Sequence, residues 1–552
     1  MRNQSYFRLV VALAIIFLTA NFAHAQSASE AYVIRGGTVV TVTGATIPRG
    51  IIVIRNGLIE AVGADVAVPA DARLIDATGM MVYPGLFDAY SSYGIKPPAA
   101  PTGGGNQQQA FIASLSAPPS PVGLLPETLV TDQLSVTAET FEQQRGAGIT
   151  TALTAPRDGV FRGQSAILNL GTEASDKLLL RAPHSLSIGF GTSRGGYPNS
   201  LMGVFAFLRQ SLLDAQHYRD EWERYSKSPR GMERPQHNNS SAALIPIVNG
   251  KMPVIFNVNT VREMKRAMTL AEEFKLKYLL SGALQSYQMA DLLKAKNVTV
   301  LLSLGFPQKP SGLENPEEEP LHYIKERLDA PKSAAELHKA GVKFAFTSGS
   351  LTRSADFVTN AGRAIEAGLP KDEALKAMTI YPAQIFGLAE QIGSIEKGKI
   401  ANLIVASGDL FSKDTKIKYT FVDGKQFINK APETPAMERR GNGGRPAGVG
   451  GSMNAAGNWA LTINSPQGVF NSPLTIQQNG EAVTGEIGSP AGVVPISNAK
   501  ISGNELTFSY AINFQGQQLT IAARGKIEGN AISGSMETMG TSFDFSGTKK
   551  PQ

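Results

Sequence analysis

The order of apolar and polar positions divides the chain into regions with different periodicities. Between Ala31 and Val82, short runs rich in β-branched residues alternate with turn signals, and Asn56-Gly57 lies between two of these runs. An Asn-Gly pair in this setting is typical of a two-residue hairpin turn. The sequence therefore predicts a small layer of β-strands at this end of the chain.

From Tyr83 onward the pattern changes to short apolar runs that alternate with amphipathic segments of helical period. One such segment follows Thr260, a residue well placed to cap the amino terminus of a helix. Alternation of this kind is typical of a parallel α/β architecture, and residues 83–390 can hold enough units for a (β/α)8 TIM-like barrel. The predicted strands of this region include 148–155, 253–259, 278–283, 298–305 and 342–349.

Strand-like runs return after the α/β region. Residues 391–430 contain two such runs, with an Asp-Gly pair as a second hairpin signal. Residues 431–456 are rich in Gly and Pro and are typical of a flexible linker. Residues 457–552 place turn dipeptides at strand spacing, which predicts an all-β barrel or sandwich module.

Residues 1–25 have the pattern of a secretory signal peptide. Arg2 and Arg8 precede the apolar run 9–18, and a small-x-small cleavage pattern ends at Ala25. We therefore expect an exported protein, periplasmic or secreted, and no transmembrane segment. The 552-residue chain has no cysteine, which excludes disulfides and thiolate chemistry, and its net charge of +6 without a basic stripe gives no indication of nucleic acid binding.

Three blocks of sequence together resemble the amidohydrolase superfamily. They are MVYPGLFDAY at 81–90, RGAGITTAL at 145–153, and the tail 364–409, which is the most specific of the three. Within the superfamily, the imidazolonepropionase-like and prolidase-like proteins are the most similar in pattern. The resemblance covers 31–427 and leaves the C-terminal β-module outside it.

The resemblance implies a metal-dependent (β/α)8 barrel at 83–390, flanked by a β-sandwich that residues 26–82 and 391–430 build from both sides of the barrel. In that family one or two divalent ions, usually zinc, activate a water molecule, and an Asp after the last barrel strand handles the proton. A His-x-His pair ending the first strand supplies two ligands, because residues two apart on a strand share a face. The implied reaction is hydrolysis of a carbon-nitrogen bond.

The positions that would hold the metal and the proton-handling Asp carry other residues in this chain. By the resemblance, these positions are Tyr90, Ser92, Asn257, Asn259, Ser281 and Gly349, with Gly349 at the place of the Asp. Neutral hydroxyls and amides are weak zinc ligands because they bring no charge. We therefore expect no cofactor and a pseudoenzyme, whereas zinc would be implied if the family activity is retained.

The five histidines that follow the signal peptide do not repair this site. His184 and His237 fall in predicted loops, and His217 falls in a polar helical stretch. His322 and His338 have helix-like surroundings. We expect each of them to be a solvated or partly buried surface histidine.

The altered site can still form a polar pocket, lined by Tyr90, Ser92, Asn257, Asn259, Ser281 and Ser348. Two interpretations stay open: the pocket binds a small polar ligand, with Tyr90 stacking on it and the amides orienting it, or the side chains fill the space that the metal left. Asp88 is retained, but its motif position can lie behind the metal ligands, so it does not by itself indicate catalysis.

Three functions follow from these patterns. The first is a metal-depleted, catalytically impaired protein that binds a ligand or pairs, as a hetero- or homo-oligomer, with a related amidohydrolase. The second is an active hydrolase of carbon-nitrogen bonds, in a non-peptide or dipeptide substrate, with an atypical site. The third is a surface- or sugar-binding protein that uses aromatic residues of the C-terminal module, either as a stacking face or, alternatively, only as its core: Trp459, Phe508, Tyr510, Phe514, Phe543 and Phe545.

Overall fold

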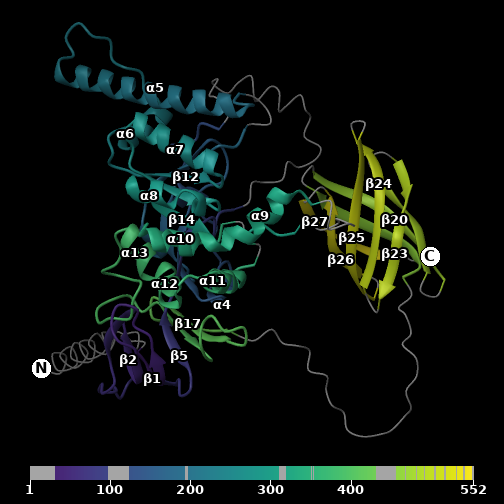
Figure 1. The fold of residues 1–552 in the computed structure, drawn as a ribbon, viewed down its shortest axis with the longest axis horizontal. Helices are drawn as coiled ribbons and strands as arrows, with labels where there is room; N and C mark the ends of the chain where they lie inside the picture. The colour runs from purple at the N-terminus through teal and green to yellow at the C-terminus, as the bar shows by residue number, and fades with distance from the viewer. Residues whose placement is uncertain are drawn as a thin grey trace, which may run out of the picture. The chain divides into compact units, whose positions relative to one another are not determined.

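A computed structural model describes most of the chain (Figure 1). The described residues are 31–96, 123–137, 139–192, 197–309, 319–349, 351, 353–429 and 455–549, the last range without 466–467, 480–481, 490–491, 503–504, 515–516, 530 and 539–540. The predicted signal peptide and nearly all of the predicted linker lie outside them. Within them, no helix has the length and apolar character needed to cross a membrane. The described chain divides into two compact units, one within 1–96, 121–306 and 328–432, the other within 97–120, 307–327 and 433–552.

The first sheet combines strands from the two ends of the larger unit. It contains β1 (Ala31–Val39), β2 (Ile47–Arg55), β3 (Leu58–Gly63), β4 (Arg73–Asp76), β5 (Met81–Pro84), β16 (Leu403–Ala406), β17 (Ile417–Val422) and β18 (Lys425–Ile428). Their order is β18-β17-β16-β5-β1-β2-β3, with β4 beside β1. β16 runs antiparallel to β5, with Leu403 paired to Pro84. The first predicted hairpin turn is confirmed, because Asn56 and Gly57 have the positive φ values, 52° and 80°, that such a turn requires.

Two further sheets carry the parallel strands. One contains β6 (Leu86–Ser91), β7 (Ile149–Thr154), β9 (Ala166–Asn169) and β10 (Leu179–Arg181), and the other contains β8 (Phe161–Gln164), β11 (Leu186–Gly189), β12 (Val254–Val258), β13 (Tyr278–Gly282), β14 (Thr299–Ser303) and β15 (Phe344–Thr347). β6 pairs in parallel with β7, and so do successive strands from β11 to β15. The Thr347 hydroxyl donates to the Tyr90 carbonyl over 2.9 Å, so β15 meets β6.

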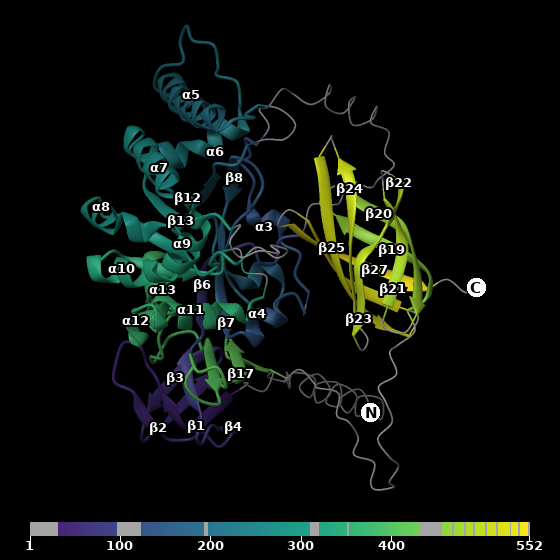
Figure 2. The ribbon, with the colours of Figure 1, turned by 45° about the vertical axis from the view of Figure 1, so that its right-hand side comes forward.

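Helices such as α7, α8 and α10 lie along the outer side of these parallel strands (Figures 1 and 2). The helices are α3 (Val130–Gln133), α4 (Glu142–Gly146), η1 (Ser175–Leu178), α5 (Leu201–Lys227), α6 (Asn239–Val248), α7 (Val261–Glu273), η2 (Ser286–Gln288), α8 (Ala290–Ala295), α9 (Leu321–Asp329), η4 (Ala330–Lys332), α10 (Ser333–Ala340), α11 (Asp356–Glu366), α12 (Lys371–Ala377) and α13 (Ile380–Ile385). The predicted cap of α7 is confirmed, since Thr260 and Glu263 form a reciprocal capping box. The mixed α/β class predicted for this region is therefore confirmed.

Alternate residues of the parallel strands face two different cores. On β12, Val254 and Phe256 pack in the cluster that includes helix residues such as Met264. Ile255, between them, packs in a separate inner cluster with Phe87. The strands therefore have an outer face toward the helices and an inner face toward one another, which is the face that carries the candidate site.

The C-terminal unit contains one antiparallel sheet of nine strands. They are β19 (Gly457–Ser465), β20 (Gly468–Asn479), β21 (Ala482–Ser489), β22 (Gly492–Pro495), β23 (Ser497–Ser502), β24 (Glu505–Phe514), β25 (Gln517–Glu528), β26 (Ala531–Thr538) and β27 (Thr541–Lys549). The order is β20-β19-β27-β26-β25-β24-β23-β21-β22, and β20 also pairs with β21. This extra pairing nearly closes the sheet on itself, so the expected all-β module has a barrel-like form.

Candidate functional site

The inner face of the parallel strands changes from apolar to polar toward their carboxyl ends. The apolar layer of this face includes Ile255, Leu279, Leu301 and Ala345. Residues two apart on a strand point the same way, so the next inward positions are Asn257, Ser281, Ser303 and Thr347. Chemistry at this end of the strands would therefore use hydroxyl and amide groups.

Sequence patterns identified part of this polar layer and missed the rest. Asn257 and Ser281 were predicted, whereas Ser187, Ser303 and Thr347 were not. Ser303 and Thr347 lie on predicted strands, and the same alternation that selected Asn257 would have found them. Ser187 lies on β11, a short strand that the apolar pattern did not predict, so only the tertiary structure places it.

Tyr90 is the centre of a buried hydrogen-bond network. Its hydroxyl lies 2.6 Å from the Ser187 hydroxyl, and it accepts a hydrogen bond of 2.9 Å from Nδ2 of Asn257. The same Nδ2 lies 3.1 Å from the Ser187 hydroxyl and 3.4 Å from the Ile188 carbonyl. Tyr90 is only 8% exposed. Two positions predicted to line the site, Tyr90 and Asn257, are thus brought together, with Ser187 as their common partner.

Asp88 is wholly buried next to Tyr90 in the chain. Its Oδ1 accepts hydrogen bonds from the backbone N–H groups of Tyr90 (3.2 Å) and Ser348 (2.9 Å), whereas its Oδ2 has no partner of ordinary geometry among the described residues. Burial raises the pKa of Asp88 to about 6, although polar groups of Ser348, Tyr93 and Tyr90 favour the charged form. Burial and the nearby Asp88 in turn raise the pKa of Tyr93.

Gly349 lies just past the end of β15, in a left-handed conformation with φ of +57°. Its backbone N–H donates to the Thr347 hydroxyl over 2.9 Å. A Cβ added at Gly349 would lie 2.1 Å from the Ser303 hydroxyl oxygen, which is far inside van der Waals contact. An Asp side chain at this position would therefore require Ser303 to move.

The other predicted lining residues lie around this network with different surroundings. Ser348 and Ser281 are buried, and Ser348 contributes its backbone N–H to Asp88. Ser92 is partly exposed beyond the end of β6. Asn259 is exposed beyond the end of β12, where a Cβ added at Gly282 would approach its Oδ1 to 2.5 Å.

Arg162 also reaches the inner face, and sequence patterns gave no signal for it. It lies on β8, and a Cβ added at Gly189 of β11 would come within 2.2 Å of its Nη2. Gly189 is paired with Asn257 across the sheet, so the guanidinium lies close to the Tyr90 network.

The histidines lie apart from this network. His184 is largely buried against the ring of Phe386, its Nδ1 has no hydrogen-bond partner among the described residues, and burial, with a smaller effect of Arg181, lowers its pKa to about 4. His217 and His338 face carboxylates of Glu221 and Glu373 at 3.1 Å and 3.4 Å. The two remaining histidines, His237 and His322, contact Asn239 and Tyr323 respectively.

The donor groups of this site do not fit zinc. Protein zinc sites combine imidazole, thiolate and carboxylate ligands, whereas Tyr90, Ser187 and Asn257 offer neutral oxygen and amide groups that bond to one another. In the described parts of the chain, no group of three or more His, Cys, Asp or Glu side chains lies together. We therefore assign no metal-dependent step to these residues.

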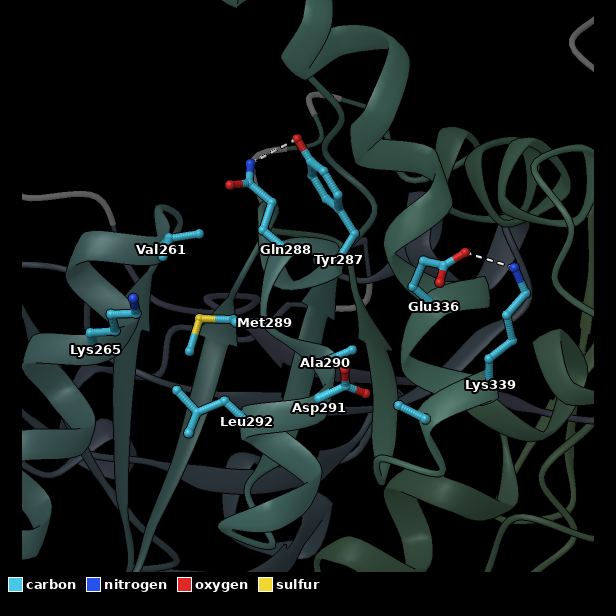
Figure 3. Close-up of a pocket in the computed structure, with 11 residues that line it drawn as sticks. Val261, Lys265, Tyr287, Gln288, Met289, Ala290, Asp291, Leu292, Glu336 and Lys339 are labelled. Atoms are coloured by element: carbon cyan, nitrogen blue, oxygen red, sulfur yellow. Dashed lines mark hydrogen bonds and ion pairs between the residues drawn. The ribbon is translucent and has the colours of Figure 1, made fainter.

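A concave feature lies among helices α7, α8, α10 and the short helix η2, and it has a volume of about 490 Å³ (Figure 3). Its charged side chains include Lys265, Asp291, Glu336 and Lys339, and Glu336 forms an ion pair of 2.7 Å with Lys339. None of the residues predicted to form the site lines it. It forms only when three helices pack, so no sequence pattern marks it.

The aromatic residues of the C-terminal module are mostly inside it. Trp459, Phe508, Tyr510 and Phe545 are each less than 5% exposed, and Phe543 is partly buried against them. The side chain of Phe514 lies outside the described part. These rings form the core of the sheet, so the stacking face considered for this module loses most of its members.

Comparisons with known proteins agree with the resemblance of residues 364–409 to the amidohydrolase superfamily. Residues 327–427 match the family model described as Amidohydrolase family. N-acetylglucosamine-6-phosphate deacetylase from Haemophilus influenzae is 38% identical over 68 residues, which span 12% of this chain and only 16% of that protein. The sequence likeness is thus concentrated in a short part of each chain.

The fold likeness extends further than the sequence likeness. An amidohydrolase from Thermotoga maritima MSB8 superposes with a TM-score of 0.60 at 23% identity, covering 72% of this chain and 100% of that structure. An adenosine deaminase from Xanthomonas campestris with bound zinc superposes with a TM-score of 0.40 at 15% identity, covering 72% of this chain and 92% of that structure. Together with the family match, the first of these confirms the resemblance to the amidohydrolase superfamily.

Proposed function

We propose that this chain, an amidohydrolase in fold and in the sequence of its tail, is a pseudoenzyme: it holds no metal and serves as a binding protein or a partner subunit. The observation that carries the proposal is a network in which Tyr90 and Asn257, at two of the expected ligand positions, form hydrogen bonds with each other and with Ser187. A metal ion would have to break these hydrogen bonds and would receive no charged ligand in return.

The surroundings of Gly349 support the same proposal. The expected position of the proton-handling Asp, Gly349, has a left-handed backbone, and a side chain there would require the Ser303 hydroxyl to move. On this proposal, two features that the resemblance implies for catalysis, the metal ligands and the acid-base group, are both replaced. Loss of one could be offset elsewhere, whereas loss of both favours a role in binding.

The finer architecture belongs to this proposal as well. We infer that β6, β7 and β11 to β15 are strands of a (β/α)8 barrel, because they pair in parallel and β15 returns to β6. The sheet that joins β5 to β16 would be the flanking β-domain, and the nearly closed nine-stranded sheet would be an appended module. The network then lies at the carboxyl ends of the barrel strands, where such barrels bind their ligands.

Export of the protein is inferred from its leader pattern alone. Cleavage after Ala25 would give a mature chain that begins at Gln26. Amino-terminal sequencing of protein recovered from the periplasmic fraction and the medium tests this. A chain that keeps Met1 and stays with the cytosolic fraction would contradict it.

The central experiment measures zinc in the purified mature protein by elemental mass spectrometry, after incubation with zinc and removal of the excess. We expect far less than one zinc per chain. A variant with the Tyr90→His and Ser92→His changes serves as a matched comparison, since it adds two imidazoles at the expected ligand positions. Stoichiometric zinc that the wild-type protein retains would overturn the proposal.

An active hydrolase with an atypical site is the alternative that one observation favours. The Oδ2 of Asp88 is buried without a partner of ordinary hydrogen-bond geometry in the described part of the chain, and burial raises the pKa of this carboxyl to about 6, so it could accept a proton near neutral pH. Release of amine from a panel of N-acyl amino acids and dipeptides tests this. Turnover by wild-type protein that is abolished in Asp88→Asn would favour this alternative over the binding role.

Partnership with a related amidohydrolase, or with a second copy, is the other form of the proposal. Native mass measurement of the exported protein from its own source would show which complex exists. A surface- or sugar-binding role for the C-terminal module has less support, because most of the aromatic residues that it would use are buried in the core of the sheet.

A further inference from the structure

The concave feature of Figure 3, which we call the outer pocket, has an apolar floor. Met289, Ala290 and Leu292 line it at the amino-terminal end of α8, and Val261 and Ala340 add apolar groups from α7 and α10. Met289 is buried, and its flexible thioether side chain can adapt to bound groups of different shape. A volume of about 490 Å³ is typical of a binding pocket and has room for several side chains of a bound molecule.

Two charged side chains of the outer pocket have no ion-pair partner in the part of the chain that the structure describes. Lys265 lies on α7 and Asp291 lies in the first turn of α8, and both are exposed. Glu336 and Lys339, by contrast, form an ion pair with each other over 2.7 Å. Figure 3 shows Lys265 on one side of Met289 and Asp291 on the other. The pocket therefore presents an unbalanced positive charge on α7 and an unbalanced negative charge on α8, with apolar surface between them.

Tyr287 and Gln288 of η2 add polar groups beside this floor (Figure 3). Nε2 of Gln288 donates to the Tyr287 hydroxyl over 3.0 Å, which leaves the hydroxyl proton free to be donated to a bound molecule. Oε1 of Gln288 accepts no hydrogen bond from the described residues. A donor and an acceptor side by side match the C=O and N–H groups of a peptide backbone, and Tyr and Met are enriched where proteins meet. These groups favour a peptide segment as the bound molecule.

We propose that the outer pocket is a docking site for a segment of a partner protein that presents large apolar side chains between an acidic and a basic side chain. The acidic side chain pairs with Lys265, the basic one pairs with Asp291, and the apolar side chains cover Met289 and Leu292. This inference rests on the proposed role as a partner subunit and names the surface that meets the partner. The pocket lies in the outer helix layer, whereas the Tyr90 network lies on the inner face of the strands, so the two are distinct sites.

The test uses the peptide Glu-Leu-Leu-Lys, acetylated and amidated at its ends so that its two charges come from side chains. Its binding to the full mature protein is measured by isothermal titration at low ionic strength, where exposed charge pairs are least screened. We expect it to bind more tightly than Lys-Leu-Leu-Lys, which has no carboxylate for Lys265, and than Glu-Gly-Gly-Lys, which cannot cover the apolar floor. Lys265→Glu should weaken its binding about threefold or more and should reverse the preference, so that Lys-Leu-Leu-Lys binds better.

Asp291→Lys tests the other charge and should make Glu-Leu-Leu-Glu the preferred peptide. The matched control is Lys325→Glu, which reverses an exposed lysine of helix α9 that does not line the outer pocket. It should leave the preference of the wild-type protein unchanged. Circular dichroism shows whether each variant is folded, and Asp291→Lys stands as an independent test if Lys265→Glu does not fold.

Three results would overturn the inference. The first is no binding of Glu-Leu-Leu-Lys to the wild-type protein. The second is equal binding of Lys-Leu-Leu-Lys or Glu-Gly-Gly-Lys, and the third is a preference that neither Lys265→Glu nor Asp291→Lys changes. The absence of metal is judged separately by zinc content, so a zinc-free protein that binds no peptide contradicts the docking site alone.

Discussion

The hydroxyl of Tyr90 on β6 lies 2.6 Å from the hydroxyl of Ser187 on β11, and Asn257 of β12 donates to both. These three residues come from three strands and are neutral. By the resemblance to the amidohydrolase superfamily, the first of these positions would carry a histidine that binds a metal. Here the three side chains turn toward one another and form hydrogen bonds among themselves.

Removing the Tyr90 hydroxyl should destabilise the larger unit. Tyr90→Phe leaves the Ser187 hydroxyl and one Asn257 donor without their partner, at a cost of about 1–2 kcal/mol in the free energy of unfolding. Urea unfolding followed by the helical circular dichroism signal measures this, because every described helix except most of α9 lies in the larger unit. The exposed Tyr323 offers a control, since Tyr323→Phe should change stability by less than about 0.5 kcal/mol.

The effects on stability of removing the Tyr90 hydroxyl and the Ser187 hydroxyl should be strongly coupled. Ser187→Ala combined with Tyr90→Phe removes both hydroxyls, so the double variant should lose less stability than the sum of the two single variants. A double-mutant cycle gives the coupling free energy directly. Additive losses would mean that the two hydroxyls do not interact as the structure places them.

Asp88 should make the protein less stable as pH rises from about 4 to about 6. The folded pKa of about 6 lies above the ordinary value of 3.8, so in this window the folded state holds a proton that the unfolded state has released. Asp88→Asn keeps an oxygen for the two backbone N–H groups and removes the buried charge. It should be more stable than wild type by up to about 3 kcal/mol at pH 8, with the difference vanishing near pH 4.

Thermal unfolding across this pH range checks the Asp88 prediction. Asp291→Asn changes an exposed carboxylate and keeps Asp88, so this control should retain the fall in stability between about pH 4 and about pH 6. A constant difference between Asp88→Asn and wild type at all pH values would contradict a titrating carboxyl.

His184 should produce the opposite slope. Its folded pKa of about 4 lies below the ordinary 6.5, so between these values the unfolded state binds a proton that the folded state does not, and stability falls as pH decreases through the window. The loss should reach at most about 3 kcal/mol near pH 4. His184→Leu keeps the apolar contact with Phe386 and should remove this part of the acid sensitivity. His217→Leu, at an exposed histidine, should retain it.

Gly349 should tolerate no side chain without loss of stability. Gly349→Ala combines a left-handed backbone with a contact to the Ser303 hydroxyl and should cost about 1–3 kcal/mol. Gly250→Ala is a matched control, because Gly250 has φ of +64° and open space around it, so it reports the backbone cost alone. Ser303→Gly should recover the excess loss of Gly349→Ala. Equal losses at the two glycines would show that the Ser303 contact is unimportant.

The fold was predictable in outline because its signals are local. The hairpin turn at Asn56-Gly57, the capping box that begins at Thr260 and the alternation of apolar runs each depend on a few neighbouring residues. The aromatic positions of the C-terminal module illustrate the limit of such signals. The alternation of apolar and polar residues left two interpretations of those rings, a stacking face or a core. The near closure of the sheet places most of them in its core.

The sequence by itself predicted which chemistry would be missing. Tyr90, Ser92 and Gly349 can be identified by their place in a motif, and residues of this neutral kind are weak metal ligands whatever the fold. The tertiary structure decided what these positions do instead. Whether two side chains on distant strands meet depends on strand pairing and register, so the contact of Tyr90 with Ser187 and the approach of Arg162 across Gly189 have no counterpart in local sequence.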